Sequence, residues 1–226
     1  NKVSVKDLYL QISSMGNEKP DIVEGNDLPD FNPDDEYLQE IKSPIFYAVQ
    51  KNINIQTGQP TILDFDMQRI SQRINIVSNI RTEGNIKRED LAAPIIELSG
   101  ACGRFNIADA CLPPPRLYRM AHQVQPDEFT QTGEGTYRCV VHFHTLGVIP
   151  SAAKGHLNGP GILQVALQVS TPQLDSSGTP VVDEEGNPVK NSRYIYGAIN
   201  PYDELTAAQL MKCATAKYTC VTAKKM

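Results

Sequence analysis

Strict alternation of side chains along two apolar stretches constrains the fold of this chain more than any other sequence feature. In residues 137–145 one face holds Tyr137, Cys139, Val141, Phe143 and Thr145, and the other holds Arg138, Val140, His142 and His144. In residues 162–169, Leu163, Val165, Leu167 and Val169 alternate with Ile162, Gln164, Ala166 and Gln168. A period of two is that of a β-strand with two unlike faces. The pattern predicts antiparallel strands that bury one face and leave the other solvated or lightly packed.

Other segments of the sequence are predicted to add strands to this sheet. Residues 3–13 place Leu8, Leu10 and Ile12 on one face of a first strand. The remaining predicted strands are a hairpin over residues 43–67 that is broken at Gly58 and Pro60, a protruding hairpin over residues 175–192, and a final strand over residues 218–226. Asp64 and Asp66 alternate with apolar neighbours, which favours an ordinary amphipathic strand over a carboxylate metal pair.

Helices are predicted at three places. Asn32 with Pro33 and Asn200 with Pro201 resemble helix starts, which gives a short helix up to about residue 41 and another up to about residue 216. Residues 70–84 are ambiguous between a helical stripe and strand alternation, and we interpret them as a helix. The predicted fold class is therefore α+β, a mainly antiparallel β-sheet or sandwich with two to three helices, in a single β-rich domain over residues 1–226.

Charge and hydropathy exclude some classes of function. The chain of 226 residues carries 26 acidic and 21 basic residues, a net charge of −5. This is the wrong sign for a protein held on nucleic acid by neutralised phosphates, so we expect no direct sequence-specific contact with nucleic acid. No apolar run approaches the roughly 20 residues that span a bilayer. The sequence predicts neither a general nucleic-acid binder nor an integral membrane protein.

The five cysteines favour a reducing compartment. They are Cys102, Cys111, Cys139, Cys213 and Cys220, an odd number without a C-x-x-C pair. A chain of this length buries a core without disulfide staples, so we expect buried or free thiols. A disulfide between Cys102 and Cys111, or between Cys213 and Cys220, is the alternative.

His142 and His144 are the candidate metal ligands. Cys139 falls on the opposite face of the predicted strand, so the three side chains do not converge on one ion. The two histidines share a face, as two ligands do in cupin-type β-barrels, which "GTYRCVVHFHTLG" resembles. Residues 145–148 hold no glutamate, although that family has one there. We expect no metal and no cofactor, and a cupin-like metal-dependent enzyme using these two histidines is the alternative.

An acidic segment over residues 17–36 is the candidate for self-association. It holds eight acids and one lysine among Gly, Pro and Asn, and buries too little apolar surface to fold alone, so we expect it to be mobile. Its apolar residues are spaced like anchors, and basic residues concentrate between positions 69 and 88. We predict that the segment docks in trans on this basic region. The residues involved are Ile22, Val23, Leu28 and Phe31, with Arg69, Arg73, Arg81, Lys87 and Arg88.

The strand order resembles that of a viral protein family. "LYLQIS", "GTYRCVVHFHTLGVIP" and "GILQVALQV" look like the strand arrangement of matrix proteins of negative-strand RNA viruses. The resemblance implies a β-rich, non-enzymatic structural protein, matrix- or capsid-like, that self-associates during virion assembly in the virion and host cytoplasm. It implies a homo-oligomer, with the viral nucleocapsid protein and a peripheral membrane contact as further partners. This chain departs in charge, since such proteins usually carry a basic membrane-facing surface.

Two further observations of the sequence bear on whether the protein is an enzyme or a binding module. The chain has no G-x-S-x-G, H-E-x-x-H, Rossmann glycine or kinase motif, so we expect no enzyme activity. The Gly-, Asn- and Pro-rich loops are also compatible with a surface-exposed or secreted binding module, although the odd cysteine is awkward for that reading. The two alternatives to a structural protein are thus a cupin-like enzyme and a binding module.

Overall fold

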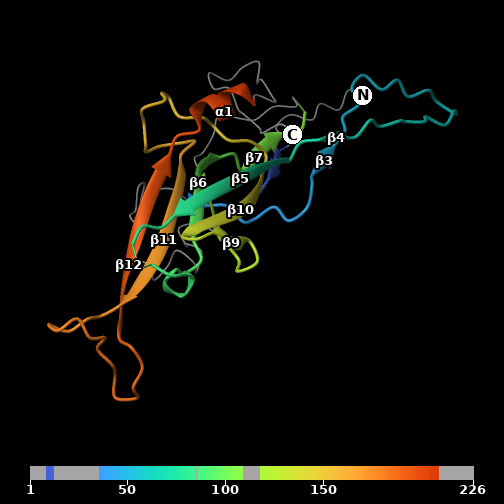
Figure 1. Ribbon diagram of the computed structural model, residues 1–226. Coiled ribbons are helices and arrows are strands. Elements are labelled where there is room, and N and C mark those ends of the chain that lie inside the picture. The colour runs from blue at the N-terminus through green and yellow to red at the C-terminus, as the bar shows by residue number, and fades with distance from the viewer. Residues whose placement is uncertain (1–8, 13–35, 85, 109–117, 209–226) are drawn as a thin grey trace.

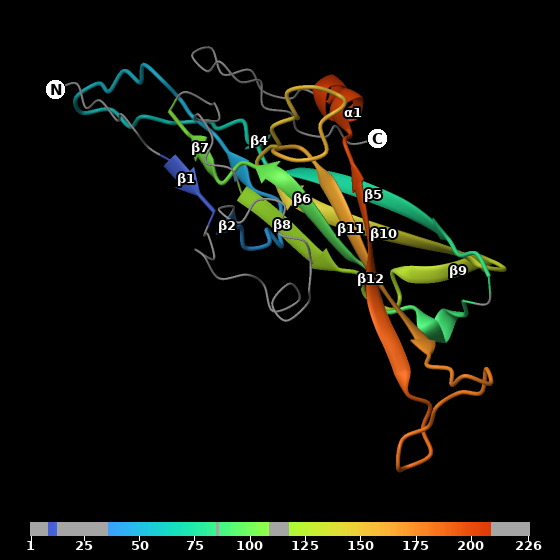
Figure 2. The same ribbon diagram turned by 90° about the vertical axis from the view of Figure 1, so that its left-hand side faces the viewer.

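Two facing sheets form the body of the protein. The computed structural model describes residues 9–12, 36–84, 86–108 and 118–208. One sheet has three antiparallel strands in the order β5-β10-β9, and the other has five in the order β12-β11-β6-β8-β2 (Figure 1, Figure 2). Their bounds are β5 Gln72–Arg81, β9 Phe129–Gly133, β10 Thr136–Thr145, β2 Glu36–Tyr37, β6 Ile95–Ala101, β8 Tyr118–Gln123, β11 Leu163–Pro172 and β12 Lys190–Ile199. All neighbours pair antiparallel except β2 with β8.

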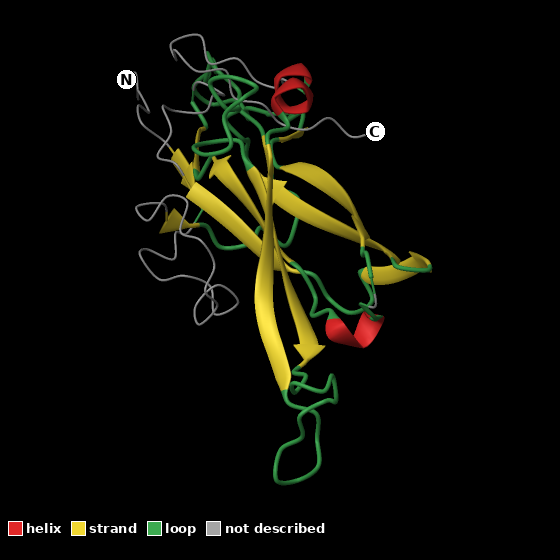
Figure 3. Cartoon of the chain, turned by 60° about the vertical axis from the view of Figure 1, so that its left-hand side comes forward, coloured by secondary structure: helices red, strands yellow, loops and turns green. Residues whose placement is uncertain are grey.

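Two small sheets stand at one end of this body. β1 (Tyr9–Gln11) pairs with β7 (Arg104–Asn106), and β3 (Phe46–Tyr47) pairs with β4 (Gln68–Arg69), both antiparallel. The described helices are a 3-10 turn, η1 (Arg88–Asp90), and α1 (Tyr202–Ala207) (Figure 3). Neither is long and apolar enough to cross a membrane. The described chain is therefore strand-rich with antiparallel sheets, as predicted, but it has one short α-helix instead of two or three.

The main core lies between the two sheets, where the alternation of the strands directs their apolar faces. Val141 and Phe143 from β10 pack with residues of the opposite sheet, such as Ile96, Leu98 and Met120. A second core cluster lies beneath the small sheets and is built from Ile41, Ile70, Cys102, Phe105, Leu146 and Ile149. The predicted faces of residues 137–145 are confirmed, because Tyr137, Cys139, Val141, Phe143 and Thr145 are all buried.

The predicted helix over residues 70–84 is wrong. Residues 72–81 form β5, which pairs with β10 along its whole length, from Thr136 opposite Arg81 to Thr145 opposite Gln72. Ile74 and Ile76 are buried, whereas Val77 of the supposed helical stripe is 48% exposed. This segment forms a strand and not a helix, because the partner strand β10 presents an apolar face on which every second residue of β5 packs.

The other predicted helices fare differently. The predicted helix up to residue 41 is wrong in its described part, because Glu36 and Tyr37 form β2 and Leu38 a β-bridge. α1 confirms the start of the helix predicted after residue 200, and residues 209–216 lie outside the described part. Asn200 is not its cap. Its side-chain amide instead donates to the carbonyls of Ala153, Lys154 and His156.

Candidate self-association surfaces

A long arm, residues 48–67, leaves the body between β3 and β4 (Figure 1, Figure 2). Its side chains are exposed nearly throughout, including Ile55 at 77%, Ile62 at 83% and Phe65 at 53%. The full set of exposed large apolar residues of the arm is Val49, Ile53, Ile55, Ile62, Leu63, Phe65 and Met67. The expected amphipathic strand around Asp64 and Asp66 is therefore not formed, because neither of its faces is buried.

The backbone of the arm also lacks the hydrogen bonds of a hairpin. Pairing of β3 with β4 ends at Tyr47 opposite Gln68. Among the described residues, the one backbone hydrogen bond beyond that point runs from Gln59 N–H to the Gln56 carbonyl at 3.5 Å. Extended backbone with unpaired donors and acceptors is what strands present to a partner. The arm therefore offers both apolar side chains and backbone groups to another surface.

The root of the arm, unlike its tip, is fixed to the body. The Ser71 hydroxyl accepts a hydrogen bond from Ile45 N–H at 2.8 Å, and Ile70 N–H donates to the Ile45 carbonyl at 3.0 Å. The ring of Tyr47 meets the ring of Phe105 edge to face, with centroids 5.1 Å apart, over the second core cluster. The arm is thus held at a defined place on a packed end of the protein.

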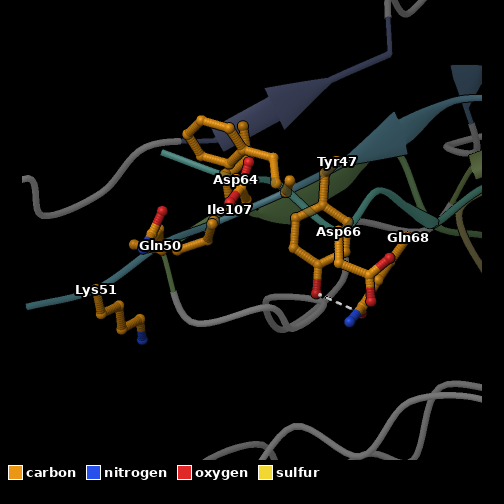
Figure 4. Close-up of a pocket in the computed structure, with 11 residues that line it drawn as sticks. Tyr47, Gln50, Lys51, Asp64, Asp66, Gln68 and Ile107 are labelled. Atoms are coloured by element: carbon orange, nitrogen blue, oxygen red, sulfur yellow. Dashed lines mark hydrogen bonds between the residues drawn. The ribbon is translucent and has the colours of Figure 1, made fainter. Parts of the chain in front are cut away.

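A pocket of about 510 Å³ opens at this root (Figure 4). Its wall includes Tyr47, whose hydroxyl lies 3.4 Å from the side-chain carbonyl oxygen of Gln68. The remaining lining combines apolar and charged groups from both sides of the arm and from β7's end: Ala48, Val49, Gln50, Lys51, Asp64, Phe65, Asp66, Ile107 and Ala108. The lining of the pocket is therefore partly apolar and partly charged.

A second projection, the knob (residues 173–189), connects β11 to β12 (Figure 1, Figure 2). Its sequence repeats the pattern D-x-x-G-x-P-V with a spacing of eight, first from Asp175 and again from Asp183. Each aspartate carboxylate accepts backbone N–H bonds within its own turn, from Ser177 and Thr179 in the first and from Glu185 and Asn187 in the second.

Three backbone hydrogen bonds of 2.8 Å tie the two turns of the knob together. They run from Val181 N–H to the Gln173 carbonyl, from Val189 N–H to the Val181 carbonyl, and from Gln173 N–H to the Val189 carbonyl. The predicted hairpin over residues 175–192 is thus a closed pair of turns. Sequence reasoning recognised the turn residues but missed the repeat, although its spacing of eight was readable.

The predicted basic docking residues do not form one common surface. Arg69 donates to the Ser71 carbonyl at 2.9 Å. Arg88 donates to the Leu91 carbonyl and lies 4.4 Å above the Phe129 ring, and Lys87 lies 4.0 Å from Glu89. Arg73 and Arg81 remain exposed at the two ends of β5. The predicted partner residues Ile22, Val23, Leu28 and Phe31 lie outside the described residues, so docking of the acidic segment stays a prediction.

His142 and His144 share the outer face of β10, as predicted. The Nδ1 of His142 donates to the Asn75 side-chain oxygen at 2.8 Å, and the Nδ1 of His144 donates to the Ile41 carbonyl at 3.0 Å. Among the described residues, no three Cys, His, Asp or Glu side chains form a cluster of metal ligands. Cys139 faces the core, and burial raises the pKa of its thiol. Cys111, Cys213 and Cys220 lie outside the described part.

The side chains of His122 on β8 and Glu128, just before β9, form a hydrogen bond. His122 Nε2 lies 2.8 Å from Glu128 Oε2, and the His122 ring meets the buried Phe143 ring edge to face. Burial disfavours the Glu128 carboxylate, but the hydrogen bonds from Gln125 N–H and from His122 outweigh burial and lower its pKa.

Acid should remove the stabilisation that Glu128 provides. Because folding lowers the pKa of Glu128, its contribution to stability is complete above its ordinary pKa of 4.5 and is lost as pH falls through the folded-state pKa. Glu128→Gln should therefore lower the thermal midpoint near pH 6 and flatten the loss of stability below about pH 4. Thermal scans of both proteins across this range measure the effect. Parallel pH curves would contradict it.

Comparison with protein-family models, with curated proteins and with solved structures finds no match to this chain, so the surfaces described above carry the inference about function.

Proposed function

We propose that this protein is a non-enzymatic structural protein, matrix- or capsid-like, that self-associates during virion assembly. The observation that carries the proposal is the arm, whose large apolar side chains are between 37% and 83% exposed. Exposed large apolar residues gathered on one segment are typical of an interaction site. The resemblance of the strand order to viral matrix proteins supports the viral setting, with the virion and host cytoplasm as its place.

A second copy of the chain is the partner that fits the arm. The arm has its root beside the 510 Å³ pocket (Figure 4), and its tip extends away from the body (Figure 1, Figure 2). Ile55 and Ile62 stand on either side of the turn at the tip. Two arms running antiparallel place the tip of each at the root of the other, which is the self-complementary geometry of a two-fold interface. Backbone groups along both arms can then pair, as strands do when they add to one another.

Charged residues beside the tip of the arm should weaken this association strongly. Each isoleucine that is buried contributes about 1.5–3 kcal/mol, so Ile55→Asp with Ile62→Asp should weaken self-association at least about a hundredfold. Neither residue belongs to a core cluster, so the fold and the thermal midpoint should be unchanged. Sedimentation velocity over a concentration series measures the association, and circular dichroism checks the fold.

A matched control distinguishes the effect of the arm residues from the effect of charging any exposed apolar residue. Leu157 is 53% exposed outside the arm, and Leu157→Asp should leave association as in the unmodified protein. The proposal fails if the unmodified protein stays monomeric at every concentration. It also fails if the double variant of the arm assembles normally.

A further inference from the structure

Three arginines share the outer face of the three-stranded sheet. Arg73 and Arg81 come from β5 and Arg138 from β10, and all three are exposed. The register sets Arg81 opposite Thr136 and Arg138 opposite Asn79, so these two arginines are diagonal neighbours. Arg73 stands eight residues along β5 from Arg81, about 27 Å at the rise of a strand. We call these residues the arginine face.

The arginine face lies on strands without acidic residues, and the exposed Glu83 and Glu134 stand in the turns beyond its Arg81 end. β5, β9 and β10 contain no Asp or Glu. None of the ion pairs among the described residues involves the three guanidinium groups. His142 lies on the same face, and burial together with the nearby Arg73 lowers its pKa. In a chain of net charge −5, an unpaired set of arginines on one face indicates an anionic partner.

The knob carries the complementary charge. Asp175, Asp183, Glu184 and Glu185 are all exposed on it. The Ser177 hydroxyl lowers the pKa of Asp175, and the Asn187 N–H lowers the pKa of Asp183, so both carboxylates stay charged. Because backbone hydrogen bonds close the two turns on each other, the knob presents these charges in a fixed arrangement. Such preorganisation reduces the entropy lost on binding.

The knob and the arginine face are apart within one molecule. Figures 1 and 2 both show the knob beyond the ends of β11 and β12, away from β5 and β10. None of the described ion pairs joins the two. An acidic projection and a basic face that form no ion pair with each other within one molecule are therefore open to contact between copies.

We propose that the knob of one copy docks on the arginine face of a second copy. This inference rests on the proposed self-association and adds a second contact to the one through the arm. A protein partner fits better than nucleic acid, because the face has no Tyr, Phe or Trp on which bases stack. The two surfaces differ, so the contact is head-to-tail, and each copy can bind one neighbour at each surface. Such contacts extend arm-linked pairs into larger assemblies.

Charge reversal of either surface should weaken assembly, and combining the two reversed proteins should restore it. One variant carries Glu184→Lys with Glu185→Lys, and the other carries Arg81→Glu with Arg138→Glu. At low salt each variant alone should lose at least about tenfold in the affinity that builds species beyond the arm-linked pair. An equimolar mixture of the two should associate to a mixed complex, because the reversed knob now matches the reversed face.

Sedimentation velocity and multi-angle light scattering measure these species. Arg104→Glu and Glu204→Lys, which reverse exposed charges on β7 and α1, are the matched controls and should behave as the unmodified protein. Docking is overturned if the mixture fails to recover association, or if both variants assemble normally. It is also overturned if face reversal leaves assembly intact but abolishes binding of a labelled oligouridine or of anionic vesicles.

The outcomes also distinguish the two proposals. If the unmodified protein forms pairs that the arm variant abolishes while both charge variants assemble normally, the docking inference fails and the proposed function stands. If the unmodified protein is monomeric at every concentration and salt, the proposed function fails first.

Discussion

Gly161→Ala is expected to lower the free energy of unfolding by about 2–5 kcal/mol. Gly161 has φ +71°, a left-handed conformation that costs an L-residue about 1–2 kcal/mol. An added Cβ would lie 2.6 Å from the Ile149 carbonyl oxygen and 2.8 Å from backbone atoms of Pro150 and Ser151. Backbone cannot move aside as a side-chain tip can, so overpacking adds about 1–3 kcal/mol. Urea denaturation monitored by circular dichroism measures the loss.

Two glycines of the same loop are matched controls. Gly159 has φ +90° but no atom within 4 Å of an added Cβ, so Gly159→Ala should show the conformational cost alone. Gly155 has neither feature, and Gly155→Ala should be nearly neutral. An effect of Gly161→Ala no larger than that of Gly159→Ala would contradict the steric explanation.

Gly161 packs closely against the middle strand of the five-stranded sheet, β6. Gly100, at the register shift between Ser99 and Ala101 of β6, also has positive φ, and its Cβ would lie 2.6 Å from Gly161 N. The Ser99 hydroxyl accepts from Ile162 N–H at 3.0 Å beside it. The two glycines thus let the bulge in β6 and the start of β11 pass each other backbone to backbone. Their contact fixes the centre of the five-stranded sheet.

Local periodicity predicted the strands of this fold well. Residues 137–145 and 162–169 alternate cleanly, and the structure confirms both as strands of the two main sheets. Residues 72–81 carry the same period, but Ile70, Ile74 and Val77 also fit a helix, and only the apolar face of β10 decides between them. A single sequence does not show which strand will lie opposite, so this ambiguity was not resolvable by pattern alone.

The candidate surfaces were less predictable than the strands. Leu63, Phe65 and Met67 alternate with acids as they would in a buried strand, yet the arm leaves both faces open. Exposure of an apolar residue is a tertiary property that alternation does not encode. Two of the three residues of the arginine face, Arg73 and Arg81, are among the predicted docking residues, but Arg138 joins them only through the register of β5 with β10. Arg69 and Arg88 are close in sequence to β5 but do not join the arginine face. Arg69 donates to the Ser71 carbonyl, and Arg88 donates to the Leu91 carbonyl.

A buried polar cluster, which the sequence pattern does not predict, lies on the face of the five-stranded sheet that points away from the main core. Arg119 donates to Glu97 Oε2 and to the side-chain oxygen of Gln164, each at 2.9 Å, and the Tyr37 hydroxyl donates to Glu97 Oε1 at 3.0 Å. The Arg119 and Glu97 side chains are 4% and 10% exposed. β2, β6, β8 and β11 each contribute one residue, so the cluster ties four strands together.

Arg119→Met is expected to cost about 3–5 kcal/mol of stability, because it leaves the Glu97 carboxylate buried without its cation. Removing that charge as well, in Arg119→Met with Glu97→Gln, should recover part of the loss, since a neutral amide can still accept the Tyr37 hydroxyl. Lys154→Met breaks an ion pair with Asp203 whose side chains are two thirds exposed, and should change stability little. Urea denaturation of the single and double variants yields the coupling between the two charges. If the double variant is as unstable as Arg119→Met alone, the uncompensated carboxylate is not the cause, and packing of the long Arg119 side chain accounts for the loss.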